Sequence, residues 1–229
     1  MALGVDEQRL VSFYGTADPS EVPLYTYAAA SRTIKVPSST VRWWVKGRNT
    51  EYEPVIRTGS ERLLSFNDLL ELYVVKVLRN RQITLSAIRR AVDYAERDGI
   101  NRVLLSKDLT TFHRDILLEG LGETVALSRS GQRALHGLLD GLTKRVVRTE
   151  QAAPVLHPEY RGEQLVDGDY PVSVSPVIAF GAPVITGGRI EAATIKARMD
   201  SGETVDEIAY DYSLAPAQIT AAVIYEHAV

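Results

Sequence analysis

The fold is decided by residues 25–48, which read YTYAAASRTIKVPSSTVRWWVKGR. This stretch predicts an alanine-rich helix from Tyr25 to about Arg32. A second helix is expected after Pro37, because proline cannot sit deep inside a helix. Either serine of the pair 38–39 can cap that helix, since a serine oxygen accepts the free N–H groups of a first helical turn. The sequence therefore predicts two short helices joined by a tight turn.

The residue pattern in these two helices is typical of a helix-turn-helix. The alanines at 28–30 are small enough for the helices to cross closely, while Val36, Val41 and Trp44 can hold the second helix against the first. The other side chains of the second helix then point outward, where they can reach phosphates and base edges in a DNA major groove. The predicted DNA contacts on this helix and just after it are Ser38, Ser39, Thr40, Arg42, Trp43, Lys46 and Arg48. An ordinary helical hairpin with a basic face is the alternative.

The residues that follow predict a small wing. Residues 52–66 contain two short apolar runs around Gly59, a pattern that favours a β-hairpin. Arg57 and Arg62 would flank its tip and contact phosphates, which position a protein on DNA without reading sequence. Further helices are expected at 66–78 and 85–97, a strand at 103–105, a second hairpin within 112–127 and a helix at 131–142.

Charge is distributed unevenly along the chain. Residues 25–97 hold thirteen Lys and Arg against seven Asp and Glu, whereas residues 151–229 hold four against eleven. The basic N-terminal part is suited to bind a polyanion, and the acidic C-terminal part is suited to bind a different partner. On charge alone, the excess of Lys and Arg in residues 25–97 is explained equally well by side chains that only keep helix faces solvated.

The sequence divides into four parts. An irregular arm is expected at 1–23, a winged helix-turn-helix domain with a small α+β extension at 24–150, and a proline-containing linker at 151–175. A small helix-turn-helix-like domain is expected at 176–229, with helices at 189–199, 205–210 and 216–227. The predicted fold class is mainly α with small β-hairpins, an α+β arrangement.

Composition excludes several functional classes. The chain has no cysteine, so disulfides and thiolate metal sites are excluded. Its four histidines are far apart, without the spacing of a metal-binding helix, and no catalytic constellation is evident. No apolar run approaches the roughly 20 residues that span a bilayer. We therefore expect a cytoplasmic protein that is not an enzyme, binds no metal or cofactor and does not associate with membranes.

The N-terminal part resembles the MerR-type winged helix-turn-helix. The resemblance rests on the block Pro37–Trp44, the wing at 52–66 and the helices that follow. Two features depart from that pattern. Lys35 stands where the motif often has glycine, and the long dimerising helix of typical MerR regulators is missing, which puts small-molecule sensing of the MerR type in doubt.

The C-terminal part resembles a small bacterial domain that was first catalogued as a family of unknown function. The matching features are a Gly-x-Pro turn at 181–183, a Gly-Arg-Ile step at 188–190 and a Glu-Ile-Ala helix at 207–209. Members of that family often accompany PIN-domain ribonuclease toxins as antitoxins. The pair Gly187-Gly188 and the loop 213–216 are mild departures from its pattern.

Together the two resemblances imply a VapB-type antitoxin of the larger, two-domain kind. Such a protein would sequester a VapC-like PIN-domain toxin and repress its own operator DNA, as a homodimer suited to a two-fold operator. An arginine could block the toxin's acidic metal site, because guanidinium pairs well with carboxylates. The candidates for that role are Arg161, Arg189 and Arg198.

Two other functions stay open from the sequence. The protein could be a DNA-binding transcriptional regulator without a toxin partner, or a protein-interaction module whose helix-turn-helix elements do not bind DNA. The C-terminal domain could itself bind DNA, the toxin or a second copy, or could serve only for packing, since fold alone does not fix function.

Overall fold

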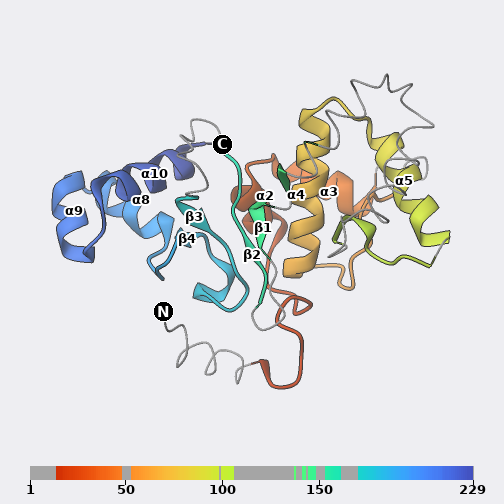
Figure 1. Ribbon diagram of the computed structural model, residues 1–229, viewed down its shortest axis with the longest axis horizontal. Helices are drawn as coiled ribbons and strands as arrows, with labels where there is room; N and C mark the ends of the chain where they lie inside the picture. Colours follow the sequence, from red (N-terminus) through yellow and green to blue (C-terminus); the bar gives the residue numbers. More distant parts are fainter. Residues whose placement is uncertain are drawn as a thin grey trace.

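A computed structural model describes residues 14–47, 53–97, 99–105, 137, 141–142, 144–147, 153–160 and 170–228. Its helices form two groups, one from each end of the chain. In Figure 1 the N-terminal helices lie on one side, the C-terminal helices on the other, and two short strands lie between them. The predicted fold class, mainly helical with small antiparallel strand pairs, is confirmed.

Within the part of the chain that the structure describes, the N-terminal group contains four α-helices around one core. They are α2 (Tyr27–Ile34), α3 (Ser38–Lys46), α4 (Phe66–Asn80) and α5 (Leu85–Arg97). The middle helix α4 is buried at every position from Phe66 to Leu78, so it forms the centre against which the others pack. Burial of this kind, rather than helix propensity alone, stabilises such short helices.

Side-chain caps set where several of these helices begin. Ser65 and Asp68 form a reciprocal capping box at the start of α4, and Thr84 accepts a hydrogen bond from the N–H of Ala87 in α5. Helix α3 differs, because its capping position is Pro37 and no side chain caps it. The predicted serine cap at 38–39 is therefore wrong.

The predicted hairpin at 52–66 is also wrong for the residues described there, 53–66. None of them pairs with another as a strand, and only Leu64 forms a β-bridge, with Tyr25. The neighbours Val55 and Ile56 are both buried, whereas successive side chains of a strand point to opposite faces. Their two N–H groups donate to the carbonyl of Trp44 at 2.7 and 3.2 Å, which bends the segment around the end of α3.

The segment 103–105 was predicted as a strand and is instead a 3-10 helix, η2 (Val103–Leu105), whose three side chains are all buried. An apolar run of this length does not distinguish a strand from a buried helical turn. The predicted hairpin within 112–127 and nearly all of the helix at 131–142 lie outside the described residues.

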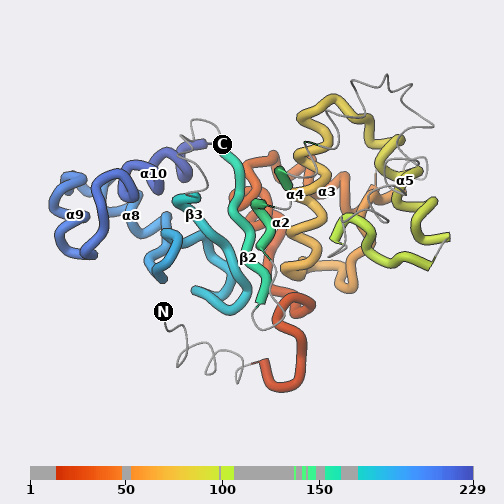
Figure 2. The backbone as a smooth tube through the Cα atoms, viewed as in Figure 1, coloured from red at the N-terminus to blue at the C-terminus, as the bar shows by residue number. Residues whose placement is uncertain are grey.

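The centre of the molecule joins the two helical groups. Strands β1 (Val146–Val147) and β2 (Val155–Leu156) pair antiparallel, and Leu156 also forms a bridge with Val174. The tube in Figure 2 follows this crossing between the two groups. Leu156 and Val174 belong to the N-terminal core, while Tyr160 and Val172 belong to the C-terminal one. Residues of the predicted linker 151–175 thus contribute to both cores. The boundaries of that linker stay a prediction.

The C-terminal group is built on three short helices. A second antiparallel pair, β3 (Val172–Ser173) and β4 (Val184–Ile185), precedes α8 (Ala192–Asp200), α9 (Val205–Tyr212) and α10 (Pro216–His227). The predicted helices at 205–210 and 216–227 are confirmed, and α8 begins three residues later than its predicted start at 189. Helix α10 starts with Pro216, where the missing N–H of proline costs nothing.

A cluster of ionisable side chains, two of them buried, links α4 to the turn before η2. Arg102 Nη1 lies 3.0 Å from Asp68 and 2.9 Å from Glu71, and its Nη2 lies 3.3 Å from Glu21. The carboxylates of Asp68 and Glu71 are 2% and 7% exposed. Burial raises the pKa of Glu71 to about 8, although Arg102 opposes that rise. Glu71 therefore keeps its proton at neutral pH in the folded protein.

This shift predicts a pH-dependent stability. Between the ordinary pKa of 4.5 and about 8, Glu71 binds a proton only in the folded state, so the free energy of unfolding should fall as pH rises through that window. Glu71→Gln stays neutral, so its free energy of unfolding should fall by roughly 4 kcal/mol less than that of the wild type between pH 5 and pH 8.5. Urea unfolding at both pH values measures the difference, and parallel losses in the two proteins would contradict the raised pKa.

Candidate DNA-binding surface

The turn between α2 and α3 is closed by local hydrogen bonds. Ser31 Oγ donates to the carbonyl of Val36 at 2.6 Å, and the N–H of Val36 donates back to the carbonyl of Ser31 at 3.1 Å. Lys35 occupies the left-handed region with φ of 56°, which explains why glycine is favoured at this position. These contacts fix the angle at which α3 leaves α2.

The two faces of α3 divide as the sequence predicts. Val41, Trp44 and Val45 are buried against the core, and Ala30 of α2 is fully buried at the helix crossing. The opposite face is polar, aromatic and basic. Its exposed members are Ser38, Ser39, Arg42, Trp43 and Lys46, with Thr40 half-buried.

The aromatic residue on the outer face is unusually accessible. Trp43 is 46% exposed, whereas its neighbour Trp44 is 4% exposed. No acidic residue lies in the first turn of α3, and Lys46 lies in its last turn. A helix with this outer face can enter a major groove with hydroxyl donors at its front and cations behind them.

The arginines predicted beside this helix differ in their surroundings. Arg57 is exposed but forms ion pairs with Asp93 at 3.5 Å and Glu96 at 2.6 Å on α5. Arg62 is exposed on the segment that leads to α4. Arg48 lies outside the described residues. Arg62 is thus the better placed of the two described arginines for a phosphate, because Arg57 would have to exchange its carboxylates for it.

The sequence did not predict that helix α10 of the C-terminal group contacts α2 and the turn of the helix-turn-helix. Tyr225 of α10 donates a hydrogen bond from its hydroxyl to the carbonyl of Thr33 at 2.8 Å. The ammonium of Lys35 lies 3.9 Å from the centre of the same tyrosine ring. The Lys35 side chain, at a position where glycine is common, therefore links the turn to α10.

A second contact brings the Gly-x-Pro turn of the C-terminal part against the N-terminal core. Gly181 has φ of 80°, and a Cβ atom there would lie 2.1 Å from the hydroxyl oxygen of Tyr25. A third contact comes from Tyr14, whose hydroxyl donates to the carbonyl of Pro176 at 2.8 Å. The signal in the sequence was the glycine itself, which was interpreted only as a family motif.

The arginines predicted to contact a toxin also have different environments. Arg198 on α8 pairs with Glu203 and Asp211 and lies 5.0 Å from the ring of Tyr212, so it cross-links the helices of its own domain. Arg189 is exposed just before α8, and Arg161 lies outside the described residues.

The described residues contain no cluster of three or more His, Asp or Glu side chains that could hold a metal ion. Within the same part of the chain, no helix has the length and apolar character needed to cross a membrane.

Comparison with known families finds two matching segments in the chain. Residues 25–95 match the MerR HTH family regulatory protein, and residues 172–225 match a protein family of unknown function, DUF433. Both resemblances inferred from the sequence are confirmed.

Similar proteins occur in Mycobacterium tuberculosis. "Putative antitoxin VapB45" is 26% identical over 226 residues, which cover 87% of this chain and 92% of that protein. "Uncharacterized HTH-type transcriptional regulator Rv1830" is 32% identical over 121 residues, about half of each chain. The crystal structure of Rv2018 covers 88% of this chain with a TM-score of 0.66 and 24% identity, which supports the fold. The resemblance to a VapB-type antitoxin with a MerR-like helix-turn-helix is thus confirmed, and the roles named in these relatives are not enzymatic.

Proposed function

We propose that this chain, which joins a MerR-type helix-turn-helix to a DUF433 segment, is an antitoxin that binds its own operator DNA and neutralises a PIN-domain ribonuclease toxin. The observation that carries the DNA-binding part is the outer face of α3, where Ser38, Arg42 and Lys46 are exposed on the second helix of the helix-turn-helix. Similarity along nearly the whole of a VapB-type protein supports the antitoxin part.

The proposed DNA contacts combine two kinds of recognition. Ser38, Ser39, Thr40 and Arg42 lie toward the front of α3 and would meet base edges and phosphates. Lys46, Arg48 and Arg62 would contact the backbone. We propose that the chain forms a homodimer, because two recognition helices match the two halves of a two-fold operator. We also propose that it acts in the cytoplasm.

The proposed toxin contact lies in the C-terminal part. Arg189 is exposed before α8, and Tyr210 on α9 is 86% exposed among acidic neighbours. Tyrosine and arginine are the residues that most often dominate protein interfaces. Arg198 is less suitable, since binding a toxin carboxylate would break its ion pairs within the domain.

Co-expression with the product of the adjacent gene tests the antitoxin function. A complex that survives affinity purification and lacks ribonuclease activity is expected, and Tyr210→Ala should weaken it by about tenfold or more. Phe180→Ala, at an exposed aromatic side chain outside α9, is the comparison variant. Recovery of the chain without a partner, or undiminished nuclease activity in the complex, would contradict the proposal.

A regulator without a toxin is the second candidate function. It is favoured by the relatives named as HTH-type transcriptional regulators, whose similarity covers half of this chain. Operator binding together with no toxin complex would support this second function.

A further inference from the structure

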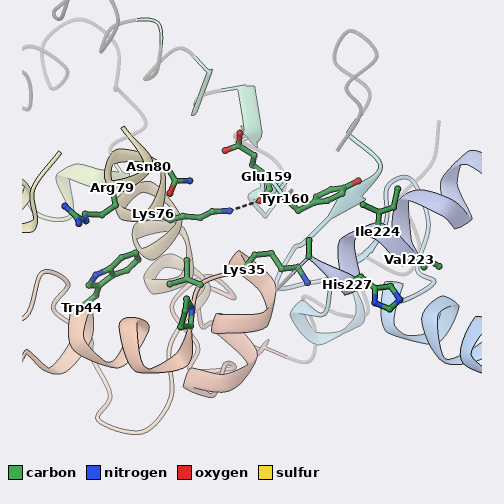
Figure 3. Close-up of a pocket in the computed structure, with 13 residues that line it drawn as sticks. Lys35, Trp44, Lys76, Arg79, Asn80, Glu159, Tyr160, Val223, Ile224 and His227 are labelled. Atoms are coloured by element: carbon green, nitrogen blue, oxygen red, sulfur yellow. Dashed lines mark hydrogen bonds between the residues drawn. The ribbon is translucent and has the colours of Figure 1, made fainter. Parts of the chain in front are cut away.

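A cleft separates α3 and α4 from α10 on the side of the molecule where the two helical groups meet. It has a volume of about 840 Å³, within the range of roughly 300–1,000 Å³ that is usual for small-molecule sites. Figure 3 shows side chains from both groups converging on it. We call it the basic cleft and define it by Lys35, Trp44, Lys76, Arg79, Tyr160 and Ile224.

One wall of the basic cleft is cationic. Lys76 and Arg79 lie three residues apart on α4 and therefore share a face of that helix. Lys35 adds a third cation from the turn before α3, and Glu159 is the only carboxylate among the described residues that line the cleft.

The other wall is apolar. Val223 and Ile224 of α10 face the cleft, and Ile224 is 36% exposed although it is a large apolar side chain. Trp44 and Tyr160 also line the cleft, with side chains that are 4% and 6% exposed. A molecule with an apolar body would cover this surface and exclude water from it.

The two lysines are held in place by the protein. Lys76 is 8% exposed, and its ammonium donates to the carbonyl of Glu159 at 2.6 Å, as the dashed line in Figure 3 marks. Lys35 is held over the ring of Tyr225. Burial lowers the pKa of Lys35, an effect that a bound anion would offset.

We propose that the basic cleft binds a small organic anion, a carboxylate or phosphate monoester that carries an apolar body. The anionic head would lie against Lys35 and Lys76, and the body against Val223 and Ile224. Because Lys35 lies in the turn of the helix-turn-helix and Ile224 lies on α10, the ligand would touch both helical groups at once. This binding site is independent of the proposed DNA and toxin functions.

Fluorescence titration with anilinonaphthalene sulfonate, an aromatic anion, tests the proposal on the full chain. We expect saturable binding to the wild type and much weaker binding of phenylnaphthylamine, which has a similar body without the charge. Lys76→Met and Ile224→Glu should each weaken binding of the sulfonate by about tenfold or more, since one removes a cation and the other adds a carboxylate. Ile224 is partly exposed, so its variant should stay folded even if Lys76→Met does not.

Two control variants match these charge changes outside the cleft. Ala217→Glu adds a carboxylate to an exposed position of the same helix, and Lys144→Met removes an exposed lysine elsewhere. Both should bind the sulfonate like the wild type, with thermal melting to confirm that every variant is folded. Competition by octanoate and by octyl phosphate then distinguishes the two kinds of head group.

Three results would overturn the proposal. They are absence of saturable binding by the wild type, equal affinity in Ile224→Glu and Ala217→Glu, and equal affinity for the uncharged analogue. Displacement of the sulfonate by a short random DNA duplex would also overturn it, because the cleft would then hold a DNA phosphate.

Discussion

Replacing Gly181 by alanine is expected to lower the free energy of unfolding by about 3 kcal/mol, of which roughly 1 comes from the positive φ and the rest from the clash with Tyr25. The new Cβ would lie 2.1 Å from the tyrosine hydroxyl and 2.7 Å from the ring carbon that bears it. Tyr25 is 4% exposed and cannot move aside without opening the core. Denaturant unfolding of the full chain measures the loss.

The protein offers a matched control and a rescue for this substitution. Gly187 has φ of 82° but no atom within 4 Å of the place where a Cβ would lie, so Gly187→Ala should show only the backbone cost. Tyr25→Phe removes the clashing oxygen, which has no hydrogen-bond partner among the described residues. The double substitution should recover part of the loss. Equal losses for the two alanine variants would show that the contact with Tyr25 does not constrain this turn.

Replacing Arg102 by methionine is expected to cost about 3 kcal/mol, because it leaves the buried carboxylate of Asp68 without its cation. Methionine keeps most of the side-chain volume and meets the same positive φ, so the change isolates the charge. Arg97→Met, at an exposed arginine in the last turn of α5, should be nearly neutral.

A second substitution separates charge from packing at this cluster. Asp68→Asn retains an oxygen that can accept the N–H of Ser65 while removing the buried charge. In the Arg102→Met background it should cost much less than in the wild type. Additive losses in a thermodynamic cycle would contradict a direct pairing of Arg102 with Asp68.

The helical part of this fold could be predicted from local patterns. Pro37 marked the start of α3, and the spacing of Val41 and Trp44 separated the buried face from the exposed Arg42. These features depend on neighbours within one or two helical turns. Prediction failed at Val55 and Ile56, where hydrogen bonds to Trp44 override the local strand pattern.

Contacts between distant residues could not be predicted. The hydrogen bond from Tyr225 to Thr33 joins residues 192 positions apart, and no local pattern encodes it. Lys35 and Gly181 were each noticed as a motif position, but their partners Tyr225 and Tyr25 became visible only in three dimensions. The basic cleft was missed for the same reason, because its walls come from helices at opposite ends of the chain.

The outer face of α3 is tested most directly by titrating the DNA upstream of the gene with the wild type and with Arg42→Ala/Lys46→Ala. Both side chains are exposed, so the variant should remain folded and bind about 10- to 100-fold more weakly, with a shallower dependence on salt. Lys144→Ala/Lys196→Ala removes the same charge away from α3 and should bind like the wild type. An equal loss of affinity in both double variants, or none in either, would contradict DNA recognition by this helix.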